Sequence, residues 1–237
     1  MLRVGLTGGL GSGKSTVARI FVEGAVDLLQ ADEIGRELMQ PGQPVYRGVL
    51  DHFRQFPDAP PLVLADGALD RASLARYAFS SGRIEELSRI VHPAVIAEQE
   101  RRIQAIFAER PAAIVMVESA LIFEADRAGT APGLRRRFDT IILVTAPDQV
   151  KIARYVARMT GGRALSAEER SRWEQDARQR IAAQIPDSEK APLCDFVIPN
   201  SGAMEETEAV ARQVLQALRN NAAAGRGHAL RGPMLPG

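Results

Sequence analysis

The stretch that decides the fold follows Met1 and reads Leu2-Arg3-Val4-Gly5-Leu6-Thr7-Gly8-Gly9-Leu10-Gly11-Ser12-Gly13-Lys14-Ser15-Thr16. Its apolar first part, residues 2–6, is typical of a short buried strand. A glycine-rich turn follows, and a helix is expected to begin near Lys14. From Gly8 onward the residues satisfy the pattern G-x-x-x-x-G-K-[ST], which surrounds phosphate oxygens with backbone N–H groups at a helix N-terminus. Because the pattern stands between a strand and a helix, we interpret it as a phosphate-binding loop.

Each residue type in this loop has a physical reason. Glycines let successive N–H groups converge on phosphate oxygens that a side chain would block. Lys14, expected to face solvent in the empty loop, can reach the β- and γ-phosphates of a nucleoside triphosphate, and the Ser15 hydroxyl can take one Mg²⁺ coordination position. We therefore expect ATP and Mg²⁺ to bind here, through Gly8, Gly9, Gly11, Ser12, Gly13, Lys14, Ser15 and Thr16.

Short apolar runs alternate with helical patterns along the rest of the chain. Buried strands are expected at residues 26–29, 112–117, 140–145 and 196–198. Helices are expected after residue 32, over 71–107 with a break at His92-Pro93, over 166–184 with a capping box of Ser166 and Glu169, and over 204–218. This alternation predicts an α/β fold with a parallel sheet. Residues 56–67 are expected to form a loop, and residues 221–237 a disordered tail.

The composition limits the class of protein. The 237 residues carry 30 basic and 29 acidic side chains, a formal net charge of +1. This balance does not suggest a nucleic acid as partner. No stretch approaches the roughly 20 apolar residues that span a bilayer, and no signal-peptide pattern follows Met1. Cys194 is the single cysteine, which excludes an intrachain disulfide, so we expect a cytoplasmic protein without a membrane partner.

A phosphate-binding loop alone does not separate a kinase from a GTPase, a motor or a sensor. The guanine-recognition pattern N-K-x-D is missing, since the only asparagines are Asn200, Asn220 and Asn221. A small kinase also needs an arginine-rich lid. Arg154 and Arg158 are spaced to share one helix face, where guanidinium groups can bind phosphoryl oxygens.

Several charged side chains have both a structural and a functional interpretation. Asp32 can cap the N–H groups of its helix, or it can orient and deprotonate an acceptor hydroxyl at the carboxyl edge of the sheet, where such folds bind ligands. Glu118, which ends the third strand, is a candidate for holding Mg²⁺ through water. Arg163, Arg170 and Arg172 are expected to pair with the acidic side chains that alternate with them.

Taken together, the motifs resemble those of the dephospho-CoA kinase family over about residues 2–218. The matching stretches are the residues 5–16, Gln30-Ala31-Asp32 against D-A-D, Asp66-Gly67-Ala68-Leu69-Asp70-Arg71 against D-G-x-L-D-R, residues 87–93 against L-x-x-I-x-H-P, Ala120-Leu121-Ile122-Phe123-Glu124 against P-L-L-F-E, Gln149 to Arg158, Arg180-Ile181 with Gln184, and Asp195 with Asn200-Ser201-Gly202. The departures are Gln30 for the first aspartate, Ala120 for the proline, and a longer segment between Arg158 and Arg180.

The resemblance implies a three-layer P-loop fold with an adenylate-kinase-like core. It implies phosphoryl transfer from ATP to the 3′-hydroxyl of the dephospho-CoA ribose, by a domain of residues 1–220 with a core (1–65, 110–150, 190–220), an acceptor-binding helical region (66–109) and a lid (151–189). Asp32 would be the base, Lys14, Arg154 and Arg158 would stabilise charge, and Asn200 would lie at the adenine site of ATP. Substrate binding is expected from Thr7, Asp32, Arg71, His92, Pro93, Leu121 and Phe123.

Two alternatives stay open. One is another small-molecule P-loop kinase, acting on a nucleoside monophosphate or a sugar acid. The other is a nucleotide-binding regulator without turnover. The motifs at residues 66–93 argue against the first alternative. Asp32 and the paired lid arginines argue against the second, since a sensor needs neither.

Overall fold

The computed structural model describes residues 1–224 of the chain, and a parallel β-sheet forms its centre. The sheet has 5 strands in the order β2-β3-β1-β4-β5, which are β1 (Leu2–Thr7), β2 (Asp27–Gln30), β3 (Ile114–Glu118), β4 (Thr140–Thr145) and β5 (Phe196–Pro199). Every neighbouring pair is parallel. The predicted α/β fold is confirmed, with small shifts in the strand bounds.

The register of the sheet brings polar strand ends together at one edge. Leu6 of β1 and Gln30 of β2 both lie opposite Glu118, the last residue of β3. On the other side of β1, Thr7 lies opposite Leu143 of β4. Because parallel strands end at the same edge, the turn that follows β1 stands beside the ends of β2 and β3. The candidate site is built on this edge.

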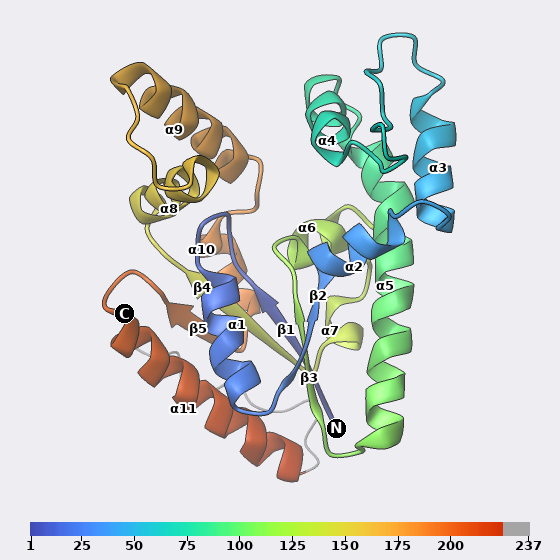
Figure 1. Ribbon diagram of the computed structural model, residues 1–237. Helices are drawn as coiled ribbons and strands as arrows, with labels where there is room; N and C mark the ends of the chain where they lie inside the picture. The colour runs from blue at the N-terminus through green and yellow to red at the C-terminus, as the bar shows by residue number, and fades with distance from the viewer. Residues whose placement is uncertain (225–237) are drawn as a thin grey trace.

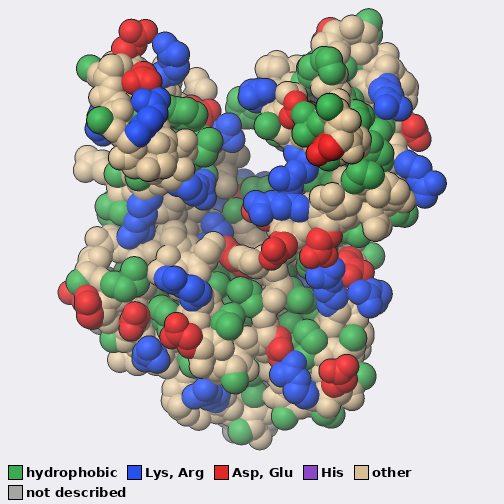
Figure 2. Space-filling view, in the orientation of Figure 1, with side chains coloured by type: hydrophobic (Ala, Val, Ile, Leu, Met, Phe, Trp, Pro, Cys, Tyr) green, Lys and Arg blue, Asp and Glu red, His purple; other side chains and the backbone are tan. Residues whose placement is uncertain are grey.

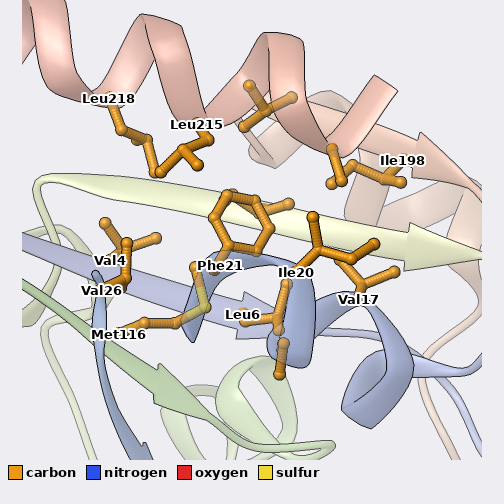
Figure 3. Packing of buried hydrophobic residues seen from close by; sticks show 14 of the residues in the cluster. Val4, Leu6, Val17, Ile20, Phe21, Val26, Met116, Ile198, Leu215 and Leu218 are labelled. Carbon is orange, nitrogen blue, oxygen red and sulfur yellow. The ribbon is translucent and has the colours of Figure 1, made fainter. Parts of the chain in front are cut away.

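One face of the sheet is covered by α1 (Lys14–Glu23) and α11 (Met204–Ala223) (Figure 1). Phe21 of α1 is fully buried and packs between Leu215 of α11 and Met116 of β3 (Figure 3). Burying a side chain of this size stabilises the fold by about 1.5–3 kcal/mol. This packing anchors the helix that begins at the phosphate-binding loop.

The other face is covered by α5 (Ile84–Glu109), α6 (Ile122–Arg127) and α7 (Leu134–Arg137) (Figure 1). Val115 and Val117 of β3 belong to the cluster on this face, together with Ile103 and Phe107 of α5. Alternate residues of β3 thus serve opposite faces, as the period of a strand requires. The sheet is therefore the middle of the three layers that the family resemblance implies.

A second core lies away from the sheet, in an arm built from α3 (Pro44–Phe53), α4 (Arg71–Ser80) and the first part of α5 (Figure 1). Helix α2 (Ala31–Leu38) leads from β2 toward this arm. Phe53 of α3 is buried against Tyr77 of α4, with ring centroids 6.3 Å apart. The acceptor-binding region was expected to begin at residue 66. Because α3 shares this core, we propose that the region begins at Pro44.

A second arm covers the segment predicted as the lid, and consists of α8 (Asp148–Thr160) and α9 (Ala167–Ala182) (Figure 1). The predicted capping box is confirmed: Ser166 Oγ accepts from the Glu169 N–H at 3.1 Å, and the Glu169 carboxylate accepts from the Ser166 N–H at 3.0 Å. Tyr155 of α8 meets Trp173 of α9 edge to face, at 6.5 Å between ring centroids. The capping box fixes the start of α9, and the contact between Tyr155 and Trp173 holds the two helices together as one hairpin.

A buried ion pair ties the base of this arm to α6. The short helix α10 (Asp187–Lys190) and a 3₁₀ turn (Ala191–Leu193) follow α9. The Lys190 side chain is 0% exposed, and its Nζ lies 2.9 Å from Glu124 Oε1. The same carboxylate oxygen accepts from the Ile185 N–H at 3.0 Å. One glutamate of α6 therefore holds two points of the segment that leaves the lid.

Replacing Lys190 by methionine is expected to lower the free energy of unfolding by about 3–5 kcal/mol, because the Glu124 carboxylate loses its buried counter-ion. Arg127→Met is the matched control. Arg127 also joins α6 to α10, through Glu189 at 3.1 Å, but the two side chains are 65% and 54% exposed, and such a pair contributes about 0–1 kcal/mol. Urea denaturation measures both variants, and equal losses would contradict the role given to Lys190.

Several sequence-based expectations are wrong. Helix α5 runs through His92 and Pro93 without a break, because a proline removes a single N–H and the 26 residues of the helix keep their other bonds and packing. The interruption lies earlier, at Gly82, whose φ of +71° suits glycine. Helix α3 was not expected, and α11 continues to Ala223, into the segment expected to be disordered. Residues 225–237 of that segment lie outside the described residues.

Candidate active site

The turn after β1 wraps around the start of α1 with the geometry of a phosphate-binding loop. Gly11 and Gly13 have left-handed backbones, with φ of +71° and +88°. A Cβ on Gly11 would come 2.3 Å from the Lys151 carbonyl oxygen, and a Cβ on Gly13 would come 2.0 Å from Asn200 Nδ2. Glycine is therefore required at both positions by conformation and by space. The N–H groups at the start of α1 are left to meet an anion.

The Lys14 side chain folds back over the loop, which corrects the expectation that it faces solvent. Its Nζ donates to the carbonyl oxygens of Gly8 at 2.9 Å and Gly9 at 3.3 Å. Burial lowers the pKa of Lys14, while the carboxylates of Glu118 and Asp32 act in the opposite direction. A phosphate in the loop would offer this ammonium a full negative charge, a stronger partner than two carbonyl dipoles.

Asn200 and Arg154 stabilise the loop through hydrogen bonds to backbone carbonyl groups. Asn200 is buried, and its Nδ2 donates to the Ser12 carbonyl oxygen at 2.8 Å while its Oδ1 accepts from Thr207 at 3.2 Å. Arg154 Nη1 donates to the carbonyl oxygens of Asn200 at 2.8 Å and Ser12 at 3.3 Å. Their contacts with ATP stay predictions. The hydrogen bonds add a positioning role, since both side chains hold the loop in shape.

Side chains from β2, β3 and α1 form an oxygen-rich group at the sheet edge. Ser15 Oγ donates to Glu118 Oε1 at 3.0 Å, and Gln30 Nε2 donates to Glu118 Oε2 at 2.8 Å. Within residues 1–224, no cluster of three or more His, Cys, Asp or Glu could hold a metal by itself. Mg²⁺ is usually bound by one or two carboxylates together with water and substrate phosphates. A hydroxyl and one carboxylate therefore fit an ion that arrives with a nucleotide.

Lys14 and Ser15 line a cavity of about 230 Å³ at the carboxyl edge of the sheet. We call it the transfer cavity. Its other walls include Asp32 of α2, Glu118 of β3 and Arg158 of the lid arm. Figure 2 shows the hollow between the two arms, where Lys and Arg side chains gather. The lid arm thus supplies a guanidinium to the cavity into which the loop opens.

Asp32 stands where the transfer cavity meets a second cavity, which it also lines. Its helix-capping interpretation is wrong, because α2 begins at Ala31, its N-cap is Gln30, and no side chain makes a capping hydrogen bond. Asp32 is exposed in the first turn of the helix, where the helix dipole stabilises a negative charge. Its carboxylate is therefore accessible to a ligand from either cavity.

The second cavity, which we call the acceptor cavity, has a volume of about 340 Å³ and lies between α2, α5 and α6. Its walls are largely apolar, with Val95 and Ile96 on α5 and Ile122 on α6. A pocket with apolar walls and a few polar groups is typical of a small-molecule site. The polar and charged side chains in its lining are Asp32, Arg36, Arg71, His92, Gln99, Ser119 and Arg137.

The predicted substrate-binding residues divide between this cavity and other places. Helix periodicity explains much of the division, since neighbouring helix residues point to different faces. His92 faces the cavity while Pro93 is exposed, and Phe123 is buried in the core between α6 and the sheet. Those that line the acceptor cavity are Asp32, Arg71, His92 and Leu121, and those that do not are Thr7, Pro93 and Phe123.

The surroundings of His92 favour the neutral form of its imidazole. Its Nδ1 lies 3.0 Å from Thr130 Oγ1. Burial lowers the pKa of His92, and the positive charge of Arg137 lowers it further. A neutral imidazole can accept or donate one hydrogen bond to a ligand without adding charge to the cavity.

Three long polar or charged side chains of the cavities were not expected from the sequence. Arg36 lines both cavities, and its i+4 spacing from Asp32 on a helix could have identified it. Gln99 and Arg137 come from α5 and α7, and no local motif marks either one. Only the tertiary packing of the chain brings these two side chains to the acceptor cavity.

The expected pairing of the outer lid arginines is confirmed in part. Arg163 contacts Glu169 at 2.7 Å, and Arg172 contacts Glu168 at 3.2 Å. Arg170 is exposed, and among the described residues it makes no such ion pair. Arg163 is exposed between α8 and α9, and Arg170 and Arg172 are exposed on α9, whereas Arg158 lines the transfer cavity.

Comparisons with solved structures agree with this architecture. A crystal structure from Thermus thermophilus, 29% identical, has a TM-score of 0.67 and covers 92% of this chain and 97% of that one. A dephospho-CoA kinase from Campylobacter jejuni, 20% identical, has a TM-score of 0.62 over 92% of this chain and 98% of that one. The predicted fold is therefore shared with known structures.

Sequence comparisons identify the family. The model of the family CoaE, dephospho-CoA kinase, matches residues 2–206. A dephospho-CoA kinase of Corynebacterium glutamicum is 33% identical over 216 residues, covering 91% of this chain and 96% of the relative. A dephospho-CoA kinase of Moorella thermoacetica is 34% identical over 224 residues, covering 94% and 95%. With a family match over most of its length and relatives of this identity, the chain belongs to the dephospho-CoA kinase family.

Proposed function

We propose that this chain transfers the γ-phosphoryl group of ATP to the 3′-hydroxyl of the dephospho-CoA ribose, giving coenzyme A and ADP, the last step of coenzyme A synthesis. The observation that carries the proposal is the position of Asp32. It lines the transfer cavity, with Lys14 and Ser15, and also the acceptor cavity. A hydroxyl that enters from one cavity can therefore meet a phosphoryl group held in the other.

The roles of the residues follow from this arrangement. Phosphoryl transfer depends mainly on positioning and on stabilising charge. The loop N–H groups hold the β- and γ-phosphates, while Lys14 and Arg158 stabilise the charge that redistributes on the γ-phosphoryl oxygens. Asp32 accepts a hydrogen bond from the 3′-hydroxyl and takes its proton as the new O–P bond forms and the bond to the β–γ bridging oxygen breaks. Arg154 keeps the loop in shape through its bonds to the Ser12 and Asn200 carbonyl oxygens, and we propose that it also contacts a phosphate.

Mg²⁺ would be held by Ser15 and, through water, by Glu118. When bound, the ion neutralises charge on the β- and γ-phosphates. The protein's own contribution is orientation: the Gln30 amide donates to one oxygen of Glu118 while the Ser15 hydroxyl donates to the other. Gln30 stands where the family has an aspartate, so this chain offers one carboxylate fewer at that corner.

The two alternatives predict different acceptors. A nucleoside monophosphate or sugar-acid kinase would need the acceptor cavity to bind a smaller, more polar molecule, and its walls are largely apolar. A regulator without turnover would need neither Asp32 nor Arg158 at the transfer cavity. The arrangement of these side chains therefore favours transfer to an acceptor with a substantial apolar surface.

The partners that we propose are small molecules, ATP and dephospho-CoA, with no nucleic acid or membrane among them, and we propose a cytoplasmic location. The near-neutral charge of +1 supports the absence of a nucleic-acid partner. A helix with the length and hydropathy that a bilayer crossing requires is not found within residues 1–224.

A coupled assay of ADP release tests the proposed acceptor. The purified chain is supplied with ATP and Mg²⁺ and with dephospho-CoA, AMP, gluconate or no acceptor. We expect turnover with dephospho-CoA to exceed turnover with AMP or gluconate by at least about 100-fold, because the smaller acceptors lose most of their contacts with the cavity. A higher rate with AMP or gluconate, or the same rate without an acceptor, would contradict the proposal.

A further inference from the structure

Two polar side chains of the acceptor cavity that the proposed mechanism does not use contact each other, Gln99 of α5 and Arg137 of α7. Gln99 is only 4% exposed although it lines the cavity. Arg137 Nη2 donates to Gln99 Oε1 at 3.4 Å, and its guanidinium carbon lies 5.0 Å from the centre of the Phe138 ring. Buried polar groups cost free energy unless they have partners. Gln99 and Arg137 keep hydrogen-bonding capacity that their mutual contact does not use, and a ligand in the acceptor cavity can satisfy it.

Ion pairing within the described residues does not explain why the Arg137 guanidinium lies in the wall of the acceptor cavity. Burial lowers the pKa of Arg137, and the carboxylates of Asp126 and Glu100 oppose that effect. Glu100 already forms an ion pair with Arg3 at 2.8 Å, and Asp126 accepts from the Leu134 N–H at 3.1 Å. Among residues 1–224, Arg137 has no carboxylate at ion-pair distance. Its one directed contact in the cavity is with Gln99.

The position of Asp32 determines which part of dephospho-CoA reaches Gln99. The 3′-hydroxyl and the adenine are attached to the same ribose. A ribose whose 3′-hydroxyl is held at Asp32 can therefore direct its adenine into the acceptor cavity, which Asp32 also lines. Val95 and Ile96 offer apolar walls on which a flat base can pack. The diphosphate needs cationic partners, and Arg36 and Arg71 line the same cavity.

We propose that Gln99 recognises the adenine of dephospho-CoA and that Arg137 positions the Gln99 amide; this inference rests on the proposed function. A glutamine amide presents an acceptor and a donor side by side, which match the amino group and a ring nitrogen of adenine. Arg137 can only donate, so its contact with Oε1 determines which end of the amide is the oxygen. A second lone pair of Oε1 then accepts from the adenine amino group, and Nε2 donates to the ring nitrogen.

The same geometry disfavours a base that carries an oxygen at the position of the amino group. In hypoxanthine a carbonyl replaces this amino group, so Oε1 would face another acceptor and lose its donor. A buried polar group without its partner is costly, and one bidentate contact to a base gives roughly 10- to 100-fold discrimination. Gln99 is therefore a specificity-determining residue, and Arg137 is a positioning residue.

The test compares dephospho-CoA with its hypoxanthine analogue as acceptors. For the wild-type chain we expect kcat/KM to favour the adenine form by roughly 10- to 100-fold. Gln99→Met should raise KM for dephospho-CoA about 10-fold or more, bring the preference close to unity and change kcat little, because Asp32 and the loop are untouched. Arg137→Met should lower the preference too, since the amide is no longer oriented. Gln104→Met is the control: it lies on the same helix, is exposed and donates to Glu100 at 2.6 Å, and the preference should stay at the wild-type value.

The outcomes separate this inference from the proposed function. Equal use of the two acceptors by the wild type, or a wild-type preference in Gln99→Met, would overturn the recognition of adenine while dephospho-CoA remained the acceptor. A KM raised equally for both acceptors would mean that another part of the substrate occupies the cavity, which also overturns it. If dephospho-CoA is not phosphorylated at all, the proposed function fails. If the variants do not fold, competition by adenosine and by inosine against dephospho-CoA in the wild-type chain decides, and equal inhibition would overturn the inference.

Discussion

Asp32→Asn is expected to lower kcat by about 10²–10⁴-fold, the contribution of a positioned general base. The change keeps the size of the side chain and removes the charge that orients the 3′-hydroxyl and accepts its proton. ATP affinity should stay near the wild-type value, because the loop and Lys14 are untouched. The free energy of unfolding should fall by only about 0.3–1 kcal/mol, since Asp32 is exposed, makes no capping hydrogen bond and is stabilised mainly by the helix dipole.

Asp51→Asn is the matched control for this prediction. Asp51 is exposed on α3 and lines neither the transfer cavity nor the acceptor cavity. Its replacement should leave kcat and KM at wild-type values. Full turnover in Asp32→Asn would remove Asp32 from the mechanism. A loss of ATP and Mg²⁺ affinity, measured by calorimetry, would instead place Asp32 beside the metal ion.

Lys14→Met is expected to lower kcat by about 10²–10³-fold, the typical effect of removing one preorganised donor at the reacting group. Methionine keeps most of the apolar stem and removes the ammonium, which donates to the carbonyl oxygens of Gly8 and Gly9 when no phosphate is present. Because burial lowers the pKa of Lys14, the charged form is already disfavoured in the empty loop. Loss of the ammonium should therefore reduce stability little and transfer greatly.

Arg19→Met is the matched control on the same helix. Arg19 is exposed on α1, away from both cavities, so turnover should not change. Single-turnover measurements separate binding from chemistry in each variant. A Lys14→Met chain with near-normal kcat, or one that unfolds at a much lower temperature than Arg19→Met, would contradict the role assigned to Lys14.

Local signals in the sequence predicted the part of the site that depends on local geometry. The loop could be identified because its glycines, Lys14 and Ser15 are contiguous and stand between a strand and a helix. Asp32 and Glu118 could be placed because Asp32 comes just after one strand and Glu118 ends another, and parallel strands end at one edge. For residues of this kind, the neighbouring sequence is enough to indicate the strand end or helix start at which they lie.

Other features depend on contacts between distant segments, and the sequence could not reveal them. Pro93 was expected to interrupt a helix, but the packing of α5 against the sheet and α2 keeps the helix continuous. Gln99 and Arg137 lie far apart in the sequence and meet only in the folded chain. Lys14 was expected to face solvent, because pattern reasoning does not include the loop carbonyl groups that it finds when no phosphate is bound.

The position of the phosphate in the product tests the central claim most directly. The wild-type chain is incubated with ATP, Mg²⁺ and dephospho-CoA, and the product is examined by phosphorus NMR and mass spectrometry beside authentic coenzyme A. We predict a single phosphomonoester on the 3′-hydroxyl, formed in equal amount with ADP. A product that carries the phosphate on another hydroxyl, or ADP released with dephospho-CoA unchanged, would contradict the claim.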